Sequence, residues 1–284
     1  MDEIVVCEPR RNRLIAKDSD KDDPLDAEKL ADLFRGGYLK RVHQSQTLER
    51  SLLKQHVSFY HDRVRDRVRL GNQVLALLRR HGVFVKSADL VEEQRQAELL
   101  EGLPDSRLLR GDVQRLFATY GFLTGQEEEI RRELIQAARE QDVVRRFERL
   151  PGFGWIRAVT FFVDIDTPQR FPSVSALWRY CGIGLERRHS GAGPTKVRLT
   201  SRGHRRLKEV LLGAAKSAIA SANNPYADKY EVWRNETGLA PTTARRNVAR
   251  ALAATLWSLW KSGGEYDPAR VGRPRSTLSV SATS

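Results

Sequence analysis

A long helical repeat of apolar residues constrains this chain more than any other feature. Between about Leu48 and Arg80, apolar side chains recur at spacings of three, four and seven, which gathers them on one face of a helix. The repeating residues are Leu53, Val57, Tyr60, Val64, Val68, Leu75 and Leu78. The spacing predicts a long amphipathic helix that ends at Gly82 and forms half of an antiparallel or intermolecular coiled coil.

Four arginines are interleaved with this repeat. They are Arg63, Arg65, Arg67 and Arg69. Such a stripe fits a solvated helix face or a surface that contacts phosphates, and the spacing alone favours neither.

The rest of the sequence predicts mainly helix. Helical patterns span about residues 88–148, with breaks at 102–104 and Gly121, and return at about 204–220 and 242–261. A loop rich in glycine and arginine separates the last two regions from the middle of the chain. The polar tail, rich in Pro and Ser, is typical of disorder.

The front of the chain has a different pattern. The β-branched, apolar run Ile4–Cys7 predicts a short buried strand, ended by Pro9. After an acidic cluster, a helix is expected from about Leu25 to Arg35, closed by Gly36-Gly37. A strand followed by an acidic helix start indicates the end of an α/β domain.

The charge indicates an anionic partner. The 284 residues carry 49 Lys and Arg against 36 acidic residues, a net charge of +13. This favours DNA or RNA as the partner, although a basic protein without such a partner has the same balance. No apolar run reaches the ~18 residues of a membrane span. The two distant cysteines, Cys7 and Cys181, fit a reduced cytoplasm.

The segment Leu150–Val159 contains two glycines two residues apart. Gly152 and Gly154 allow a sharp turn that exposes backbone N–H groups at the start of the next helix, as in a helix-hairpin-helix element. That turn can hold a phosphate without reading its sequence. An ordinary turn between two helices has the same pattern.

A basic loop further on holds a candidate nucleophile. Eight Lys and Arg but only two acidic residues lie between Gly184 and Glu209, and Ser190 precedes Gly191 there. A serine beside glycine is accessible, and clustered guanidinium groups can stabilise the charge of a phosphoryl transition state. The alternative is a flexible phosphate-binding loop with no nucleophile.

Two carboxylates near the front could bind a metal ion. Asp23 and Asp26 are three residues apart at a predicted helix start, so they can share one side, and their oxygens suit Mg²⁺. A two-metal site needs more carboxylates than these. Capping of the helix N-terminus is the alternative.

Taken in order, these motifs resemble the DEDD transposases of the insertion-sequence 110 family, over nearly the whole chain to about Tyr266. Lys21, Asp23, Asp26 and Ala27 match the family's K-T-D-x-x-D-A element, and the end of the long helix matches its linker. The C-terminal series is matched by Leu150–Gly154, Arg170–Ser173, Tyr180–Ile183, Ser190-Gly191 and Ser201–Leu207.

The resemblance implies a mainly α fold in four parts. Residues 1–45 would be the C-terminal remnant of a RuvC-like (RNase H-fold) α/β domain, and 46–146 a helical coiled-coil linker. Residues 147–265 would form an α-helical serine transposase domain with the helix-hairpin-helix-like element, and 266–284 a disordered tail. The family's first Asp and its Glu normally precede Ile4, so we expect this chain to begin after them; Glu8 does not replace the Glu.

The resemblance also assigns roles. Ser190 corresponds to the proposed nucleophile, with Ser201 a weaker candidate, and Asp23 and Asp26 to Mg²⁺ ligands. The expected nucleic-acid contacts are Gly152, Gly154, Arg187, Arg188, Lys196, Arg198, Arg202, Arg205 and Arg206. The implied partners are DNA, a guide RNA encoded by the element, and further copies of the chain in a dimer or tetramer. The implied location is the bacterial nucleoid, with no membrane.

Two alternatives stay open at this stage. The chain could be an inactive, nucleic-acid-binding remnant that cannot assemble the metal site. It could also bind nucleic acid in a role unrelated to transposition.

Overall fold

The computed structural model describes residues 5–7, 23–39, 41–45, 47–188, 196–200, 202–221 and 223–272, without the side chains of 23–26, 187–188 and 196–197. The chain divides into two compact units, residues 1–48 and 49–284. None of the helices described is long and apolar enough to cross a membrane.

The described residues of the first unit include helix α1 (Asp23–Arg35). Gly37 follows it with φ +70°, and the N–H of Tyr38 donates to the Leu33 carbonyl, which ends the helix as predicted. The predicted buried strand is reduced to a single antiparallel β-bridge between Cys7 and Arg41, and Val6 is 43% exposed. Ile4 and Pro9 lie outside the described residues.

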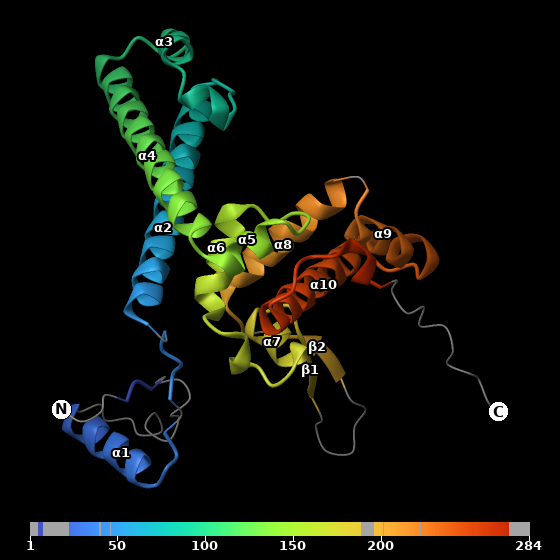
Figure 1. Cartoon of the computed structure of the whole chain (residues 1–284). Helices are drawn as coiled ribbons and strands as arrows, with labels where there is room; N and C mark the ends of the chain where they lie inside the picture. The colour runs from blue at the N-terminus through green and yellow to red at the C-terminus, as the bar shows by residue number, and fades with distance from the viewer. Residues whose placement is uncertain are drawn as a thin grey trace. The chain divides into compact units, whose positions relative to one another are not determined.

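The second unit begins with a helical hairpin (Figure 1). Its arms are α2 (Leu48–Arg80) and α4 (Arg107–Arg139), joined through a short 3₁₀ turn, η3 (Ser87–Leu90), and helix α3 (Glu93–Glu101). The arms are antiparallel, because Arg67 on α2 pairs with Glu127 on α4 while Gly71 packs against Tyr120. On α2 the predicted residues Val57, Tyr60 and Leu78 are buried, whereas Val68 is 48% exposed and Val74, which the repeat left out, is buried.

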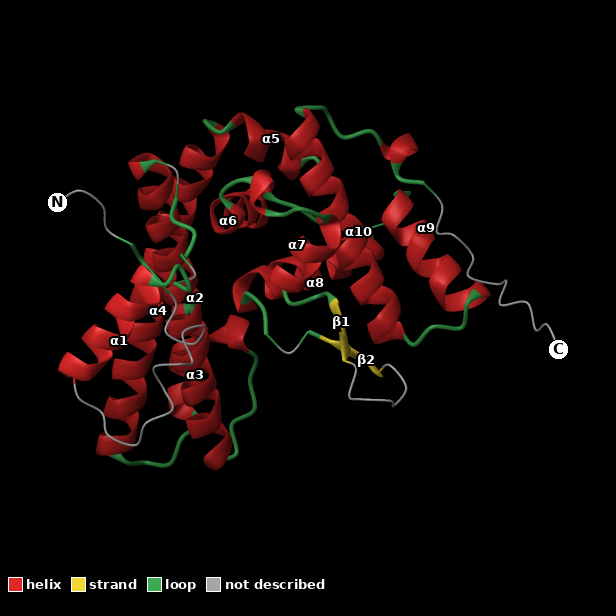
Figure 2. Cartoon of the chain, turned by 90° about the horizontal axis from the view of Figure 1, so that it is seen from below, coloured by secondary structure: helices red, strands yellow, loops and turns green. Residues whose placement is uncertain are grey.

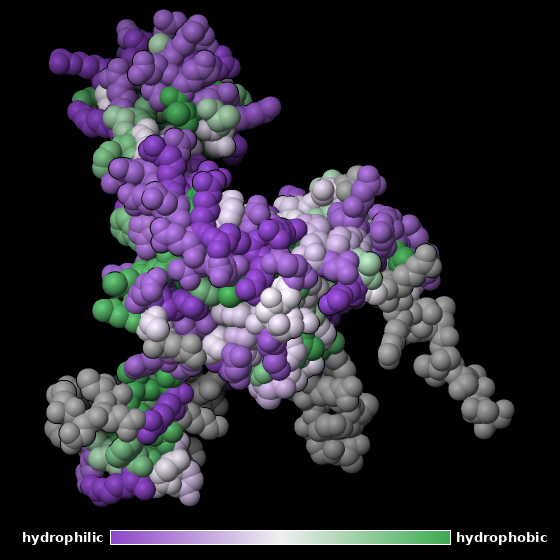
Figure 3. Space-filling view, viewed as in Figure 1, coloured by the Kyte–Doolittle hydropathy of each residue, from purple (hydrophilic) through white to green (hydrophobic). Residues whose placement is uncertain are grey.

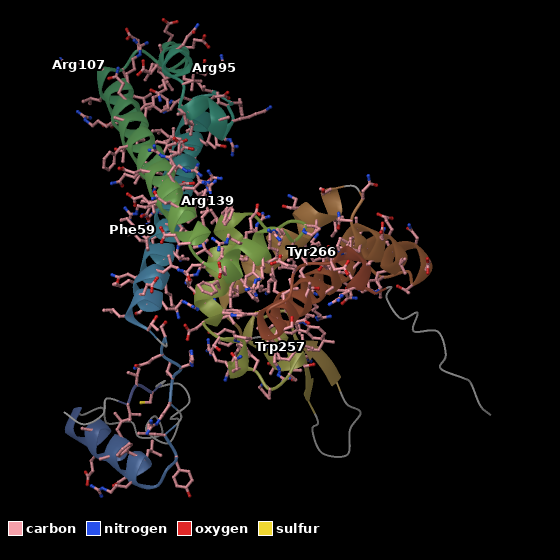
Figure 4. All side chains as sticks on the ribbon, in the orientation of Figure 1. Phe59, Arg95, Arg107, Arg139, Trp257 and Tyr266 are labelled. Atoms are coloured by element: carbon pink, nitrogen blue, oxygen red, sulfur yellow. The ribbon has the colours of Figure 1, made fainter. Side chains whose placement is uncertain are left out.

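A small apolar core closes the tip of the hairpin. Leu78 on α2, Leu90 on η3, Leu99 on α3 and Phe117 on α4 are all buried there. Arg95 and Arg107 mark this tip in Figure 4. The predicted break at Gly102 is present, whereas Gly121 lies inside α4, since an exposed glycine in a helix weakens it without ending it.

The remaining helices form a compact bundle. They are α5 (Asp142–Glu148), α6 (Trp155–Ile165), α7 (Val174–Tyr180), α8 (Arg205–Ala220), α9 (Pro225–Glu231) and α10 (Pro241–Ser262). Shorter helical turns are η4 (Pro168–Arg170), η5 (Val232–Glu236) and η6 (Pro268–Arg270). The most apolar helix, α6, is buried from Ala158 to Ile165.

The main core forms where this bundle meets the lower half of the helical hairpin. Phe147 on α5, Phe161 on α6, Leu211 on α8 and Leu252 on α10 are all fully or almost fully buried. The core includes Val57 and Tyr60 of α2, so the hairpin and the bundle share it. It continues past residue 265, because Tyr266 and Val271 pack against it; residues 273–284 of the predicted tail lie outside the described residues.

Strands β1 (Leu185–Arg188) and β2 (Lys196–Leu199) form an antiparallel pair that projects from the helical bundle (Figure 2). Sequence analysis expected only a loop here. In the register, Glu186 faces Arg198 and Leu185 faces Leu199. The two-stranded hairpin is the only sheet among the described residues.

Candidate functional site

The β1–β2 hairpin carries the candidate nucleophile between its strands. Ser190 follows the end of β1 by two residues and lies outside the described residues, as does Ser201. The predicted contacts Arg187, Arg188 and Lys196 lie in the two strands. The structure therefore defines the base from which the Ser190 loop extends.

Two glycines bring the two ends of the hairpin together. Gly182 precedes β1 with φ +71°, and Gly203 follows β2. A Cβ on Gly203 would lie closer than 3.0 Å to the Gly182 backbone, so no side chain fits at this crossing. The N–H of His204 donates to the Tyr180 carbonyl at 2.7 Å, and the N–H of Thr200 donates to the Gly184 carbonyl at 3.1 Å. The glycines of the predicted Tyr180–Ile183 and Ser201–Leu207 motifs are thus each other's packing partners.

Helix α10 also holds the base of the β1–β2 hairpin in place. The Nε of Arg250 donates to the Ile183 carbonyl at 2.7 Å, and its Nη1 donates to Asn247 Oδ1 at 2.8 Å. Burial and the nearby positive charge of Arg246 both lower the pKa of Arg250. The indole of Trp178 on α7 donates to the Arg250 carbonyl at 3.0 Å. Sequence analysis missed Arg250, because nothing in its own segment indicates a partner 67 residues away.

A buried ion pair joins α6, α8 and α2. Asp164 on α6 is fully buried and accepts from Arg206 Nε at 2.7 Å and from Arg206 Nη2 at 2.5 Å. Nη1 of Arg206 also donates to Ser58 Oγ on α2 at 2.9 Å. Arg206 was predicted to contact nucleic acid, but the structure engages its guanidinium inside the protein, so we do not propose it as a contact.

Two histidines flank this ion pair. His204 is the N-cap of α8, where its Nδ1 accepts from the N–H of Leu207, and its ring lies 5.9 Å from that of Tyr180. His61 on α2 is hydrogen-bonded to Thr160 at 3.0 Å. Burial lowers the pKa of both histidines, Arg206 lowers it further, and the charge of Asp164 opposes the shift.

The segment predicted to be a helix-hairpin-helix element lies in the turn between α5 and α6. Gly152 has φ +81°, and a Cβ there would lie closer than 3.0 Å to the carbonyl oxygen of Ala214 on α8. Its own carbonyl accepts from Arg157 Nη1 at 2.6 Å. Gly154 is exposed and is the N-cap of α6, with open space around it. Close packing against α8 explains the glycine at position 152, whereas Gly154 is exposed.

The other predicted contacts differ in exposure. Arg198 and Arg202 are exposed near the end of β2. Arg205 is exposed too, and its Nε lies 3.0 Å from Glu209 Oε1. These three arginines are available on the surface beside the base of the hairpin.

The two carboxylates of the candidate metal site lie in the first turn of α1. The backbone puts Asp23 and Asp26 three residues apart, on one side of that helix. Their side chains lie outside what the structure describes. No cluster of three or more His, Cys, Asp or Glu residues suited to a metal is present among the described residues.

Comparisons with known proteins show which family the sequence resembles. A family model described as "Transposase IS116/IS110/IS902 family" matches residues 144–231, from α5 through α9, and a DEDD transposase model of the IS110 type matches residues 3–83. Both matched models describe transposases. The chain belongs to the IS110 family of transposases.

Two curated relatives are similar to the chain. The transposase for insertion sequence element IS1111A of Coxiella burnetii (strain RSA 493 / Nine Mile phase I) is 22% identical over 241 residues, which are 83% of this chain and 64% of the relative. The transposase for insertion sequence element IS1328 of Yersinia enterocolitica is 27% identical over 157 residues, 54% of this chain and 46% of the relative. The chain thus spans less than two thirds of either relative's length.

Proposed function

We propose that this chain is a DNA strand-transfer protein that cuts and rejoins DNA through Ser190. The observation that carries the proposal is the construction around the Ser190 loop. A two-stranded hairpin brackets it, and a glycine crossing and Arg250 fix the base of that hairpin. Family membership supplies the class of reaction.

In the proposed step, Ser190 Oγ attacks the phosphorus of a phosphodiester. An Oγ–P bond forms while a P–O bond to one sugar breaks, and the serine proton ends on the released sugar hydroxyl. The number of ester bonds is conserved, so a second DNA hydroxyl can reverse the step and rejoin a strand without an external energy source. Arg187, Arg188, Lys196, Arg198, Arg202 and Arg205 would supply positive charge near this loop.

Asp23 and Asp26 are the residues that would hold Mg²⁺. Their spacing on the first turn of α1 fits two ligands of one ion, and Mg²⁺ at a phosphodiester stabilises developing negative charge. Two carboxylates do not make a full two-metal site, so further ligands must join them. We also propose that the basic surface can bind an element-encoded RNA.

Assembly into a dimer or tetramer is a further part of the proposal. Leu52 and Phe59 lie seven residues apart on one face of α2 and are 55% and 47% exposed. Figure 3 shows hydrophobic atoms along the outer edge of this arm, and Phe59 is labelled there in Figure 4. A second copy that covers this face would remove apolar surface from water.

The test of the proposal is strand exchange on element-end DNA with Mg²⁺, for the full chain and its Ser190→Ala variant. Recombined product from the full chain that disappears in the variant supports the proposal. If the full chain binds the DNA but gives no product under any Mg²⁺ concentration, the alternative of a binding-only remnant is correct.

A further inference from the structure

A groove of about 350 Å³ runs beside the base of the hairpin, on the exposed side of α8. Arg205, Lys208, Glu209 and Leu212 line it along α8, at the spacing of one helix face. The opposite side consists of Gly182, Gly203 and Thr200. All of these residues belong to the described part of the chain.

Thr200 is the residue that the fold does not explain. It is 8% exposed, and its Oγ1 has no hydrogen-bond partner among the described residues. Proteins rarely leave a buried hydroxyl without a partner, and valine would fill the same space without that cost. An acceptor brought into the groove by a ligand would satisfy the hydroxyl.

The charges of the groove favour an anionic ligand. Arg205 and Lys208 place two positive charges on its α8 side, against one carboxylate. That carboxylate, Glu209, is already paired with Arg205 at 3.0 Å. The Lys208 side chain is exposed, and its methylenes lie 3.5 Å or more from a Cβ built on Gly182. The aliphatic part of Lys208 thus lies beside Gly182, which has no side chain, and its charged end belongs to an exposed residue.

The glycine crossing adds backbone access. Since Gly182 and Gly203 carry no side chains, a ligand can approach the main chain closely on this side. A phosphate group carries several acceptor oxygens and negative charge, so it can accept from a hydroxyl and pair with an ammonium group at once. This combination suits a phosphodiester better than a neutral ligand.

We propose that this groove binds one phosphate of a nucleic-acid backbone, with Thr200 Oγ1 as a hydrogen-bond donor and Lys208 as the paired cation. The site holds the strand beside the Ser190 hairpin and takes no part in bond cleavage. It rests on the proposed function only in requiring that the chain binds nucleic acid.

The test measures affinity of the full chain for a duplex DNA at several salt concentrations, by fluorescence anisotropy. Lys208→Gln should reduce the slope of log affinity against log salt by about one, because one phosphate contact is lost. Lys216→Gln is the matched control, since Lys216 is an exposed lysine of α8 that does not line the groove. It should leave the slope unchanged.

Thr200→Val tests the hydroxyl separately. It should weaken binding about tenfold, which corresponds to the loss of one hydrogen bond to a charged group, and leave the salt slope unchanged. It should not lower the melting temperature, because the removed hydroxyl has no partner among the residues that the structure describes. A loss of binding that tracks a loss of stability would overturn the proposal.

The proposal is also overturned if, with both the duplex DNA and an RNA strand, Lys208→Gln and Lys216→Gln change the slope equally or Thr200→Val binds as well as the unsubstituted chain. An RNA strand of the same length forms a second arm. Weakening in either arm supports the site and identifies whether it holds DNA or RNA. Failure of Ser190 to react would contradict the proposed function and leave these binding results untouched.

Discussion

Gly182 and Gly203 pack backbone against backbone at the base of the β1–β2 hairpin. Residues 21 positions apart in sequence meet there because Gly203 carries no Cβ, which would come closer than 3.0 Å to the Gly182 main chain, while Gly182 adopts φ +71°. The crossing joins the end of α7 to the start of α8. It thereby sets where the strands on either side of Ser190 leave the helical bundle.

Gly203→Ala should therefore destabilise the protein. The added methyl group must displace the Gly182 backbone, and forced packing of this kind costs about 1–3 kcal/mol. The free energy of unfolding, from denaturant titration, measures the change.

Gly125→Ala on α4 is the matched control. Gly125 is exposed within a helix and has open space where its Cβ would lie. Alanine there should stabilise the protein by about 0.5–1 kcal/mol. If both substitutions change the free energy of unfolding alike, the close crossing is not present in solution.

Arg206→Ala should lower the free energy of unfolding far more than Arg205→Ala does. Loss of Arg206 leaves Asp164 fully buried and without its cation, which typically costs about 3–5 kcal/mol. Arg205→Ala removes only an exposed pair with Glu209, which contributes about 0.5 kcal/mol or less. Thermal and denaturant unfolding of the two variants makes the comparison, and equal losses would show that Asp164 does not depend on Arg206.

Stability should fall as the pH is lowered from 7 to 5. Burial lowers the pKa of His61 and His204, so the unfolded chain binds protons more readily than the folded protein does. The contribution of these histidines to the free energy of unfolding is complete above the histidine pKa of the unfolded chain, about 6.5. It decreases below that pH by up to about 1.4 kcal/mol per histidine for each pH unit.

His204→Asn isolates one of these groups. Asparagine is a good helix N-cap and does not titrate, so the variant should fold at pH 7 and show a shallower decrease in unfolding free energy toward pH 5. An unchanged pH dependence would show that His204 titrates alike in the folded and unfolded states.

Arg250→Lys should slow strand transfer without weakening DNA binding to the same extent. Lysine keeps the charge but lacks the rigid, planar guanidinium whose Nε and Nη1 donate in fixed directions to Ile183 and Asn247, so we expect the base of the hairpin to shift. Small displacements of reacting groups reduce rates about 100-fold. Single-turnover rates and DNA affinities of this variant are compared with those of Arg245→Lys, an exposed control on α10. Equal rates for the two variants would show that Arg250 does not support strand transfer.

The sequence predicts the helical parts of the fold well. The spacing of apolar residues predicted α2 at Leu48–Arg80, because the buried face of an amphipathic helix appears in the sequence as apolar residues three or four positions apart. The β1–β2 hairpin was missed, since charged and glycine-rich segments of four residues carry no alternating apolar pattern. The strand at Ile4–Cys7 was predicted from β-branched residues alone, and the structure shows only one bridge there.

The candidate site was less predictable than the fold. Ser190, Arg198 and Arg202 stand out by local composition, whereas Asp164 lies in the apolar run of α6 and its partner Arg206 lies 42 residues away. Arg206 therefore looked like one more surface cation. A buried arginine differs from an exposed one by its ion pair with a residue distant in sequence. A single sequence does not show which residues form such a pair.

The central claim is that Ser190 forms a covalent bond to DNA phosphorus. The most direct test incubates the full chain with element-end DNA labelled on both sides of the cleavage site, and resolves protein–DNA adducts under denaturing conditions. We predict a covalent adduct that Ser190→Ala abolishes and Ser201→Ala retains. An adduct that persists in Ser190→Ala, or that maps to another residue by mass spectrometry, would contradict the claim.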